Sequence, residues 1–171
     1  MSILSNIFKQ DKGGLIEKAD KLVYAANFLA TSMREPLEKK YPIIKQIDEE
    51  KFITVLTVAH VYWAVQALGS IKPKPDKAKR DELLKIIESE IIRWNSNGST
   101  YVKDCAAFVE RGIRNSTLAD LESNKQLAND LLGTWAVWNL TGSSPSTDDE
   151  LNIVRFIGVA VSDYMLAWWR V

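Results

Sequence analysis

Apolar residues recur three and four positions apart along most of this chain, which is the spacing of a buried face on an α-helix. The first such stripe begins after Gly13 and Gly14 and runs through Leu15, Leu22 and Leu29. No window shows the strict alternation of apolar and polar residues that a half-buried β-strand requires. The pattern therefore predicts an all-α fold, a single-domain helical bundle of about six helices with short connections.

Prolines and capping residues mark where the predicted helices begin and end. Pro36 and Pro42 punctuate the chain after the first helix, and residues 41–47 are compatible with a short helical segment. Asp48 and Thr147 are predicted N-caps, because their side-chain oxygens can accept hydrogen bonds from the free N–H groups of a first helical turn. The later helices are predicted over residues 49–70, 81–95, 100–114, 117 or 123 to 140, and 148–170.

Two of these helices are apolar enough to lie at the centre of the bundle. Residues 52–71 carry no formal charge, and the helix over residues 148–170 has apolar residues on opposite sides. A helix that is apolar on both sides is usually covered on both sides. We therefore expect residues 49–70 and 148–170 to form the central helices, unless the second face of the latter meets another subunit.

The ends and the main connector are less regular. Residues 1–14 are predicted to be a mobile or loosely docked arm, whereas residues 15–171 are long enough to bury a core as one all-α domain. Residues 71–80 hold two prolines and a surplus of Lys and Arg, which indicates a solvated connector. Contact of this basic stretch with phosphate or an anionic surface is the alternative.

Charge and cysteine content exclude several classes of protein. The formal net charge is zero, so no overall field would draw the chain to nucleic acid or to an anionic membrane. The single cysteine cannot form an intramolecular disulfide, and with one histidine it cannot build a Cys/His zinc cluster. We therefore expect a cytoplasmic protein without a metal or other cofactor.

Residues 52–71 are long enough to cross a bilayer, but their polar groups argue against it. His60 lies near the middle of this stretch with Thr54 and Thr57 close by, and a bilayer offers such groups no water. The other helices also carry apolar stripes that need an apolar partner of this kind. The stretch is therefore predicted to be a buried core helix and not a membrane span.

His60, the only histidine, is the main candidate for chemistry. Thr57 lies one turn before it and could hydrogen-bond to it, and Trp63 lies one turn after it. No carboxylate or nucleophile stands three or four positions away, as a catalytic histidine on one helix would need. Three interpretations stay open: a hydrogen-bonded core histidine, a residue of a ligand pocket, or a catalytic base whose partner comes from another helix.

The six tryptophans suggest either core packing or binding surfaces. Trp135 and Trp138 fall on the expected inner face of their helix, so they are candidates for an apolar ligand pocket together with His60, Thr57 and Trp63. A second group of apolar residues lies on the expected outer face of the last helix, where it could form an interface: Phe156, Val159, Leu166 and Trp169.

The leading functional hypothesis is a non-enzymatic protein that acts through protein–protein contacts, as a homodimer formed through the last helix. The alternatives are a binder of an apolar small molecule near His60 and an enzyme that uses His60. The chain contains no phosphate-binding Gly-rich loop, no His-Glu-x-x-His and no Gly-x-Ser-x-Gly. These absences favour a binding protein over an enzyme.

Overall fold

Helices make up almost all of the backbone that the structure describes. The computed structural model describes the backbone of residues 15–67, 77–117 and 126–169. It describes the side chains of residues 19–66, 77–78, 81–117 and 126–163. Within these ranges there is no strand, which confirms the predicted all-α helical bundle. The elements are α2 (Leu15–Lys40), η1 (Pro42–Gln46), α3 (Glu49–Ala67), α4 (Lys77–Trp94), α5 (Gly98–Asn115), α7 (Leu127–Thr141) and α8 (Asp148–Trp169).

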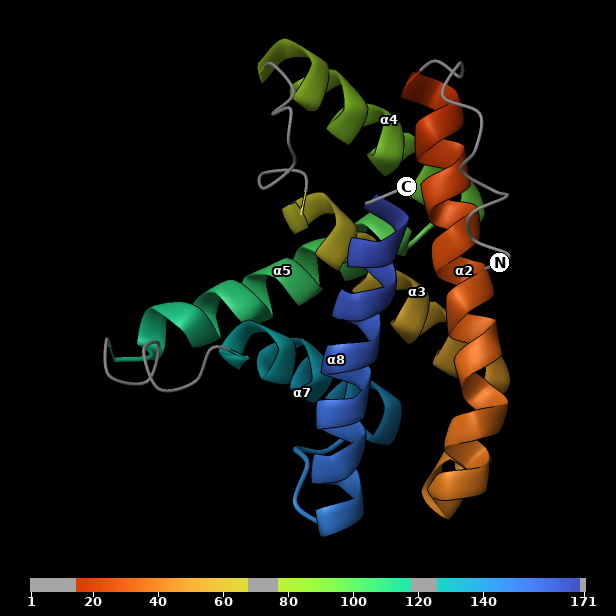
Figure 1. Ribbon diagram of the computed structural model, residues 1–171, viewed down its shortest axis with the longest axis vertical. Coiled ribbons are helices and arrows are strands. Elements are labelled where there is room, and N and C mark those ends of the chain that lie inside the picture. Colours follow the sequence, from red (N-terminus) through yellow and green to blue (C-terminus); the bar gives the residue numbers. More distant parts are fainter. Residues whose placement is uncertain (1–14, 68–76, 118–125, 170–171) are drawn as a thin grey trace.

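Helix α3, which carries no charge from Phe52 onward, lies in the middle of this arrangement, as its apolar composition predicted. It packs against α2, α5, α7 and α8 (Figure 1). Phe52, Leu56 and Ala59 on α3 are fully buried. Apolar side chains leave water on every side of this helix, and the resulting hydrophobic burial is the dominant favourable term in folding.

The core consists of two apolar clusters that meet on α3 and α5. The larger cluster joins α3 to the second half of α2, η1, α5, α7 and α8, and the smaller joins the end of α3 to the first half of α2 and to α4. Trp63 and Val102 contact both clusters. Helix α3 is therefore packed against other elements along most of its length.

The first helix continues through Pro36, where the sequence predicted an interruption. α2 ends at Lys40, and Pro36 lies inside it. Pro36 is exposed, while Met33 and Leu37 on either side of it are buried. The proline ring therefore faces water, and burial of its neighbours offsets the lost backbone hydrogen bond. The predicted short helical segment after it is the 3-10 turn η1.

Both predicted N-caps are present. The backbone N–H of Lys51 donates to Asp48 Oδ1 at 2.9 Å, at the start of α3. At the start of α8, the N–H of Glu150 donates to Thr147 Oγ1 at 3.2 Å, and the N–H of Thr147 donates to Glu150 Oε2 at 3.0 Å. This reciprocal pair is a capping box. Backbone N–H groups of Ser146 and Thr147 lower the pKa of the Glu150 carboxyl.

Helix α4 begins at Lys77, earlier than the predicted start at Asp81. Residues 77–80 are Lys, Ala, Lys and Arg, which all favour a helix once the prolines have passed. The predicted connector thus overlaps the first turn of α4, and its remaining residues lie outside the described ranges, as do the predicted arm at residues 1–14 and residues 118–125 before α7.

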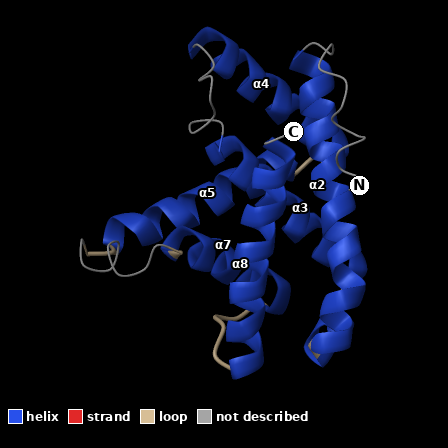
Figure 2. Cartoon of the chain, viewed as in Figure 1, coloured by secondary structure: helices blue, strands red, loops and turns tan. Residues whose placement is uncertain are grey.

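Helices α7 and α8 approach each other more closely than side chains would allow. A Cβ atom built on Gly133 would lie 2.0 Å from the carbonyl oxygen of Val154, and one on Gly158 would lie 2.3 Å from the carbonyl oxygen of Asn129. The short loop over residues 142–147 joins the two helices (Figure 2). Gly142, the first residue of this loop, has a φ of 83°. Glycines therefore set the distance between these helices.

Candidate functional site

His60 lies in the core and has no carboxylate partner among the described residues. Its side chain is fully buried, and Nδ1 lies 2.7 Å from the carbonyl oxygen of Leu56. Because a carbonyl only accepts, Nδ1 carries the proton and Nε2 is left as an acceptor without a partner. Burial lowers the pKa of His60 from 6.5 to about 4. The imidazole is therefore neutral near pH 7.

The other residues expected around His60 do not converge on one pocket. Thr57 is buried, but its hydroxyl accepts a hydrogen bond of 3.5 Å from Asn27 Nδ2 and makes none to His60. Trp63 is half-buried, and its indole N–H has no partner. Trp135 is buried, with 3% exposure. Only Trp135 of this group lines the principal cleft described below.

The prediction that Trp138 faces inward is wrong. Its side chain is 46% exposed and packs edge-on against Phe108 of α5, with ring centroids 5.9 Å apart. Trp135 and Trp138 are three residues apart and point about 60° apart around the helix. The buried residues of α7 are Leu132, Gly133, Trp135, Ala136, Val137 and Leu140, so Trp135 lies at one margin of the buried face and Trp138 lies just beyond it.

A cleft of about 630 Å³, here called the α3 cleft, opens beside the first two turns of α3. Its walls are the start of α3, the turn between α4 and α5, the start of α5 and the end of α7. The lining residues are Asp48, Glu50, Lys51, Thr54, Val55, Val58, Asn95, Ser96, Asn97, Tyr101, Trp135 and Asn139. Its volume is within the range of about 300–1,000 Å³ that small-molecule sites occupy.

Backbone caps and one lysine hold the α3 wall of the cleft. Asp48 caps α3, and the Lys51 side chain reaches across to donate from Nζ to the carbonyl oxygen of Leu140 at 3.1 Å. That carbonyl lies in the last turn of α7, where helix carbonyls lack partners and favour a cation. Lys51 therefore ties the start of α3 to the end of α7.

The turn between α4 and α5 forms the second wall. The N–H of Asn97 donates to Asn95 Oδ1 at 2.9 Å, and the N–H of Gly98 donates to the carbonyl oxygen of Asn95 at 2.7 Å. A Cβ atom on Gly98 would lie 2.4 Å from Ile91 Cγ2, so the chain passes too close to α4 for any larger residue. The turn is thus fixed by its own hydrogen bonds and by close packing.

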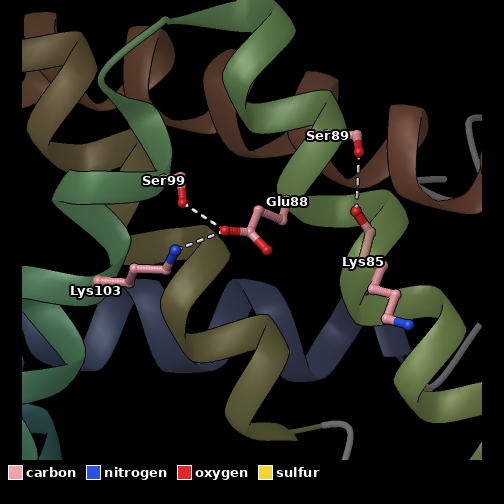
Figure 3. Close-up of polar contacts among 5 residues, drawn as sticks. All are labelled: Lys85, Glu88, Ser89, Ser99 and Lys103. Atoms are coloured by element: carbon pink, nitrogen blue, oxygen red, sulfur yellow. Dashed lines mark hydrogen bonds and ion pairs between the residues drawn. The ribbon is translucent and has the colours of Figure 1, made fainter.

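Figure 3 shows a polar cluster that holds this turn from the outer side. Glu88 Oε1 of α4 accepts hydrogen bonds from Ser99 Oγ at 2.8 Å and from Lys103 Nζ at 2.7 Å, both of which belong to α5. Lys103 and Ser99 lower the pKa of the Glu88 carboxyl. The pair is exposed, so its contribution to stability is small, but it aligns the start of α5 with α4.

Helix α7 supplies the third wall through an oriented indole. Trp135 Nε1 donates to Asp104 Oδ2 of α5 at 2.9 Å, and Asn139 Nδ2 donates to the carbonyl oxygen of Trp135 at 2.9 Å. The close contact of α7 with α8 at Gly133 lies two residues before Trp135. This wall is therefore positioned by contacts on both sides of α7.

Several polar groups in the α3 cleft have no partner in the described part of the chain. No hydrogen bond or ion pair there engages the side chains of Glu50, Thr54 or Tyr101, and the Tyr101 ring is 40% exposed. A carboxylate accepts hydrogen bonds, whereas the two hydroxyls both donate and accept. The cleft can therefore hydrogen-bond a polar ligand and stack a flat or apolar part of it on the Tyr101 ring.

Sequence reasoning missed most of this site. Asn95 and Asn97 lie where one predicted helix ends and before the next begins, and Tyr101 and Asn139 carry no recognisable motif. The one usable signal was the density of asparagine at two helix ends, at 95–97 and 139. Asparagine also favours turns and helix ends for local reasons, so this signal alone does not indicate a site.

The predicted interface on α8 is exposed where it is described. Phe156 is 37% exposed and Val159 is 36% exposed, and Lys40 Nζ lies 6.0 Å from the Phe156 ring centroid. Leu166 and Trp169 lie in α8, but their side chains fall outside the described part. Within that part, Leu151 adds to the same exposed face.

The single cysteine is a core residue, as predicted. Cys105 is fully buried, and burial raises the pKa of its thiol.

Among the described residues, no three His, Cys, Asp or Glu side chains are arranged to hold a metal ion. The helices of the described ranges include none that is long and apolar enough to cross a membrane.

Comparisons with protein-family models, curated proteins and solved structures find no match for this chain.

Proposed function

We propose that this protein is a binding protein whose α3 cleft takes a small polar molecule with a flat or apolar part. One observation carries the proposal: separate elements of the bundle place unpartnered polar groups, Glu50, Thr54 and Tyr101, beside Trp135 in one cleft of about 630 Å³. A mostly pre-formed cleft with a few convergent polar groups is the usual form of a ligand site.

The proposal moves the ligand site away from His60. The buried imidazole offers a ligand only one unpartnered acceptor, and it does not line the α3 cleft. No described carboxylate contacts it, so a catalytic role for His60 is not part of the proposed function. A cytoplasmic setting remains our expectation, since the only cysteine is buried and reduced.

Ligand-observed NMR tests the proposal with a panel of small amides, monosaccharides and aromatic alcohols. A binder of the α3 cleft should perturb the indole N–H resonance of Trp135 and raise the melting temperature of the protein. Tyr101→Ala should lose this binding, because Tyr101 lines the cleft.

Phe28→Ala provides the control. Phe28 is an exposed aromatic residue, 40% accessible, that lines neither the α3 cleft nor the clefts beside it, so its removal should leave binding unchanged. If Tyr101→Ala and Phe28→Ala both bind every compound as the unmodified protein does, the α3 cleft is not the site.

Self-association through α8 is a second candidate function, favoured by the exposure of Leu151, Phe156 and Val159 on one helix face. Analytical ultracentrifugation at high micromolar concentration tests it. A dimer that dissociates in Phe156→Ser but persists in Tyr24→Ser would support an interface on α8. A strict monomer at these concentrations would rule it out.

A further inference from the structure

Two further clefts extend the α3 cleft around the start of α3. The middle cleft, of about 510 Å³, shares Asp48, Thr54 and Asn95 with the α3 cleft. The outer cleft, of about 240 Å³, shares Asn27 and Trp94 with the middle cleft. Clefts that share lining residues form one groove, which runs from α7 past the first turn of α3 to the space between α2 and α4.

The basic side chains of this groove already have partners within the protein. Lys51 Nζ donates to the carbonyl oxygen of Leu140. Arg93 Nη2 lies 2.6 Å from Asp20 Oδ1 and 2.6 Å from Glu90 Oε2, which pairs the carboxylates of the outer cleft with one guanidinium. Among the described lining residues, Lys51 and Arg93 stand against five carboxylates, which belong to Asp20, Asp48, Glu49, Glu50 and Glu90.

The carboxylates at the centre of the groove have no such partners. Glu49 and Glu50 line the middle cleft and form no ion pair in the described part of the chain, and Asp48 contributes one oxygen to the cap of α3. The uncompensated charge of the groove is therefore negative. A cationic ligand would gain electrostatic attraction here, and an acidic ligand would be repelled.

The lining also fits an extended chain better than a docked helix. An amphipathic helix binds through an apolar groove, whereas the middle cleft is lined mainly by acids, asparagines and Thr54. Asparagine amides offer both donors and acceptors, which match the N–H and C=O groups of an extended peptide backbone. Trp94 and Trp135 lie at separate points of the groove, where their rings can contact alternate side chains.

We propose that this groove binds an extended, basic peptide segment of a partner protein, with its cationic side chains at Glu49 and Glu50. The inference rests on the proposed function, because the α3 cleft is one end of the groove. The new elements are the chemical class of the ligand and the path that the ligand follows along the groove.

Fluorescence anisotropy with the full chain tests this inference. The probes are fluorescein-labelled peptides of about nine residues that alternate lysine with proline, glutamine with proline, or glutamate with proline, since such sequences remain extended. The lysine peptide should bind about tenfold more tightly than the glutamine peptide and weaken with added salt, and the glutamate peptide should not bind.

Charge-removing variants locate the binding. Glu49→Gln combined with Glu50→Gln should weaken the lysine peptide about fivefold or more. Asp81→Asn combined with Glu82→Gln removes the same charge from exposed positions of α4 outside the groove and should change binding less than about twofold. Circular dichroism melts establish that both double variants fold.

Each other outcome overturns the inference. Equal weakening by both double variants would mean that overall charge, and not the groove, attracts the peptide. Binding of the small-molecule panel at Trp135 without binding of any peptide would refute the inference and leave the proposed function intact. A preference for monosaccharides or longer oligosaccharides would assign the groove to carbohydrate. If neither peptides nor small molecules bind, the inference and the proposed function both fail.

Discussion

Replacing Gly133 with alanine places a methyl group where the backbone of α8 already lies. The added Cβ would be 2.0 Å from the carbonyl oxygen of Val154 and 2.8 Å from its carbonyl carbon. Atoms of this kind normally stay more than about 3 Å apart, so α7 and α8 must separate locally by about 1 Å. That separation would also displace the α7 wall of the α3 cleft.

Two opposing effects determine how far Gly133→Ala should change the free energy of unfolding. Overpacking a close contact costs about 1–3 kcal/mol, and this one lies near the upper end because a backbone carbonyl cannot rotate away. Alanine gains about 1 kcal/mol over glycine in helix propensity. Gly133→Ala should therefore lower the free energy of unfolding by about 2 kcal/mol, and the melting temperature by about 4–8 °C for a chain of this length.

Gly112→Ala is the matched control for this measurement. Its added Cβ would lie 2.5 Å from Leu131 Cδ2 and 2.7 Å from Leu131 Cδ1, which are the ends of a flexible side chain. Leu131 can change rotamer, so the helix-propensity gain should leave stability unchanged or higher. Urea denaturation followed by far-UV circular dichroism compares the variants. If Gly133→Ala is as stable as Gly112→Ala, the helices are not in backbone contact.

Three further predictions concern hydrogen-bonded polar groups. Burial holds the pKa of His60 at about 4 against 6.5, so below pH 6.5 the unfolded chain binds the proton first. The free energy of unfolding should therefore fall by about 2 kcal/mol from pH 7.5 to pH 5, and by less in His60→Asn, as urea denaturation at each pH would measure. Thr147→Ala should lower the free energy of unfolding by about 1 kcal/mol, because it removes the N-cap of α8. Thr147→Ser keeps the capping hydroxyl and should therefore keep most of that stabilisation, as measured by thermal unfolding. Asp104→Ala should cost about 1 kcal/mol and shift the indole N–H resonance of Trp135 in NMR spectra, because the indole loses its acceptor.

Each of these predictions has a result that contradicts it. A pH dependence that is identical in His60→Asn and in the unmodified protein would mean that the imidazole is solvated in the folded state. Equal stability of the alanine and serine variants at Thr147 would assign no stabilisation to the capping hydroxyl. A Trp135 resonance that Asp104→Ala leaves unchanged, and that matches the spectrum of the surface variant Asp163→Ala, would exclude the hydrogen bond between α5 and α7.

Local chemistry made the helices predictable. The caps at Asp48 and Thr147 depend only on residues within the next turn, so the starts of α3 and α8 could be located from the sequence. The burial of α3 followed from the absence of charge over residues 52–71, and the core position of Cys105 from its place on an apolar stripe. Each of these inferences needed only the spacing of residues along one helix.

The errors arose where contacts between helices decided the outcome. The helix continues through Pro36 because its neighbours Met33 and Leu37 are buried by other elements, which local propensity does not register. Trp138 is exposed because it lies beyond the margin of the buried face of α7, where Trp135 is the last buried position. The sequence stripe could not distinguish these two tryptophans, since both fall within the width of an apolar helix face.

The sequence by itself determined an all-α protein with an apolar central helix that carries the only histidine. Only the tertiary structure decided where a ligand could bind. The α3 cleft combines residues near 48–58, 95–101 and 135–139, which no periodicity connects. Their convergence depends on how closely α7 meets α8 and on where the turn before α5 packs, and both distances are set by glycines at inter-helix contacts. A helix pattern specifies which face is buried, but the spaces that remain between buried faces are a property of the packed bundle.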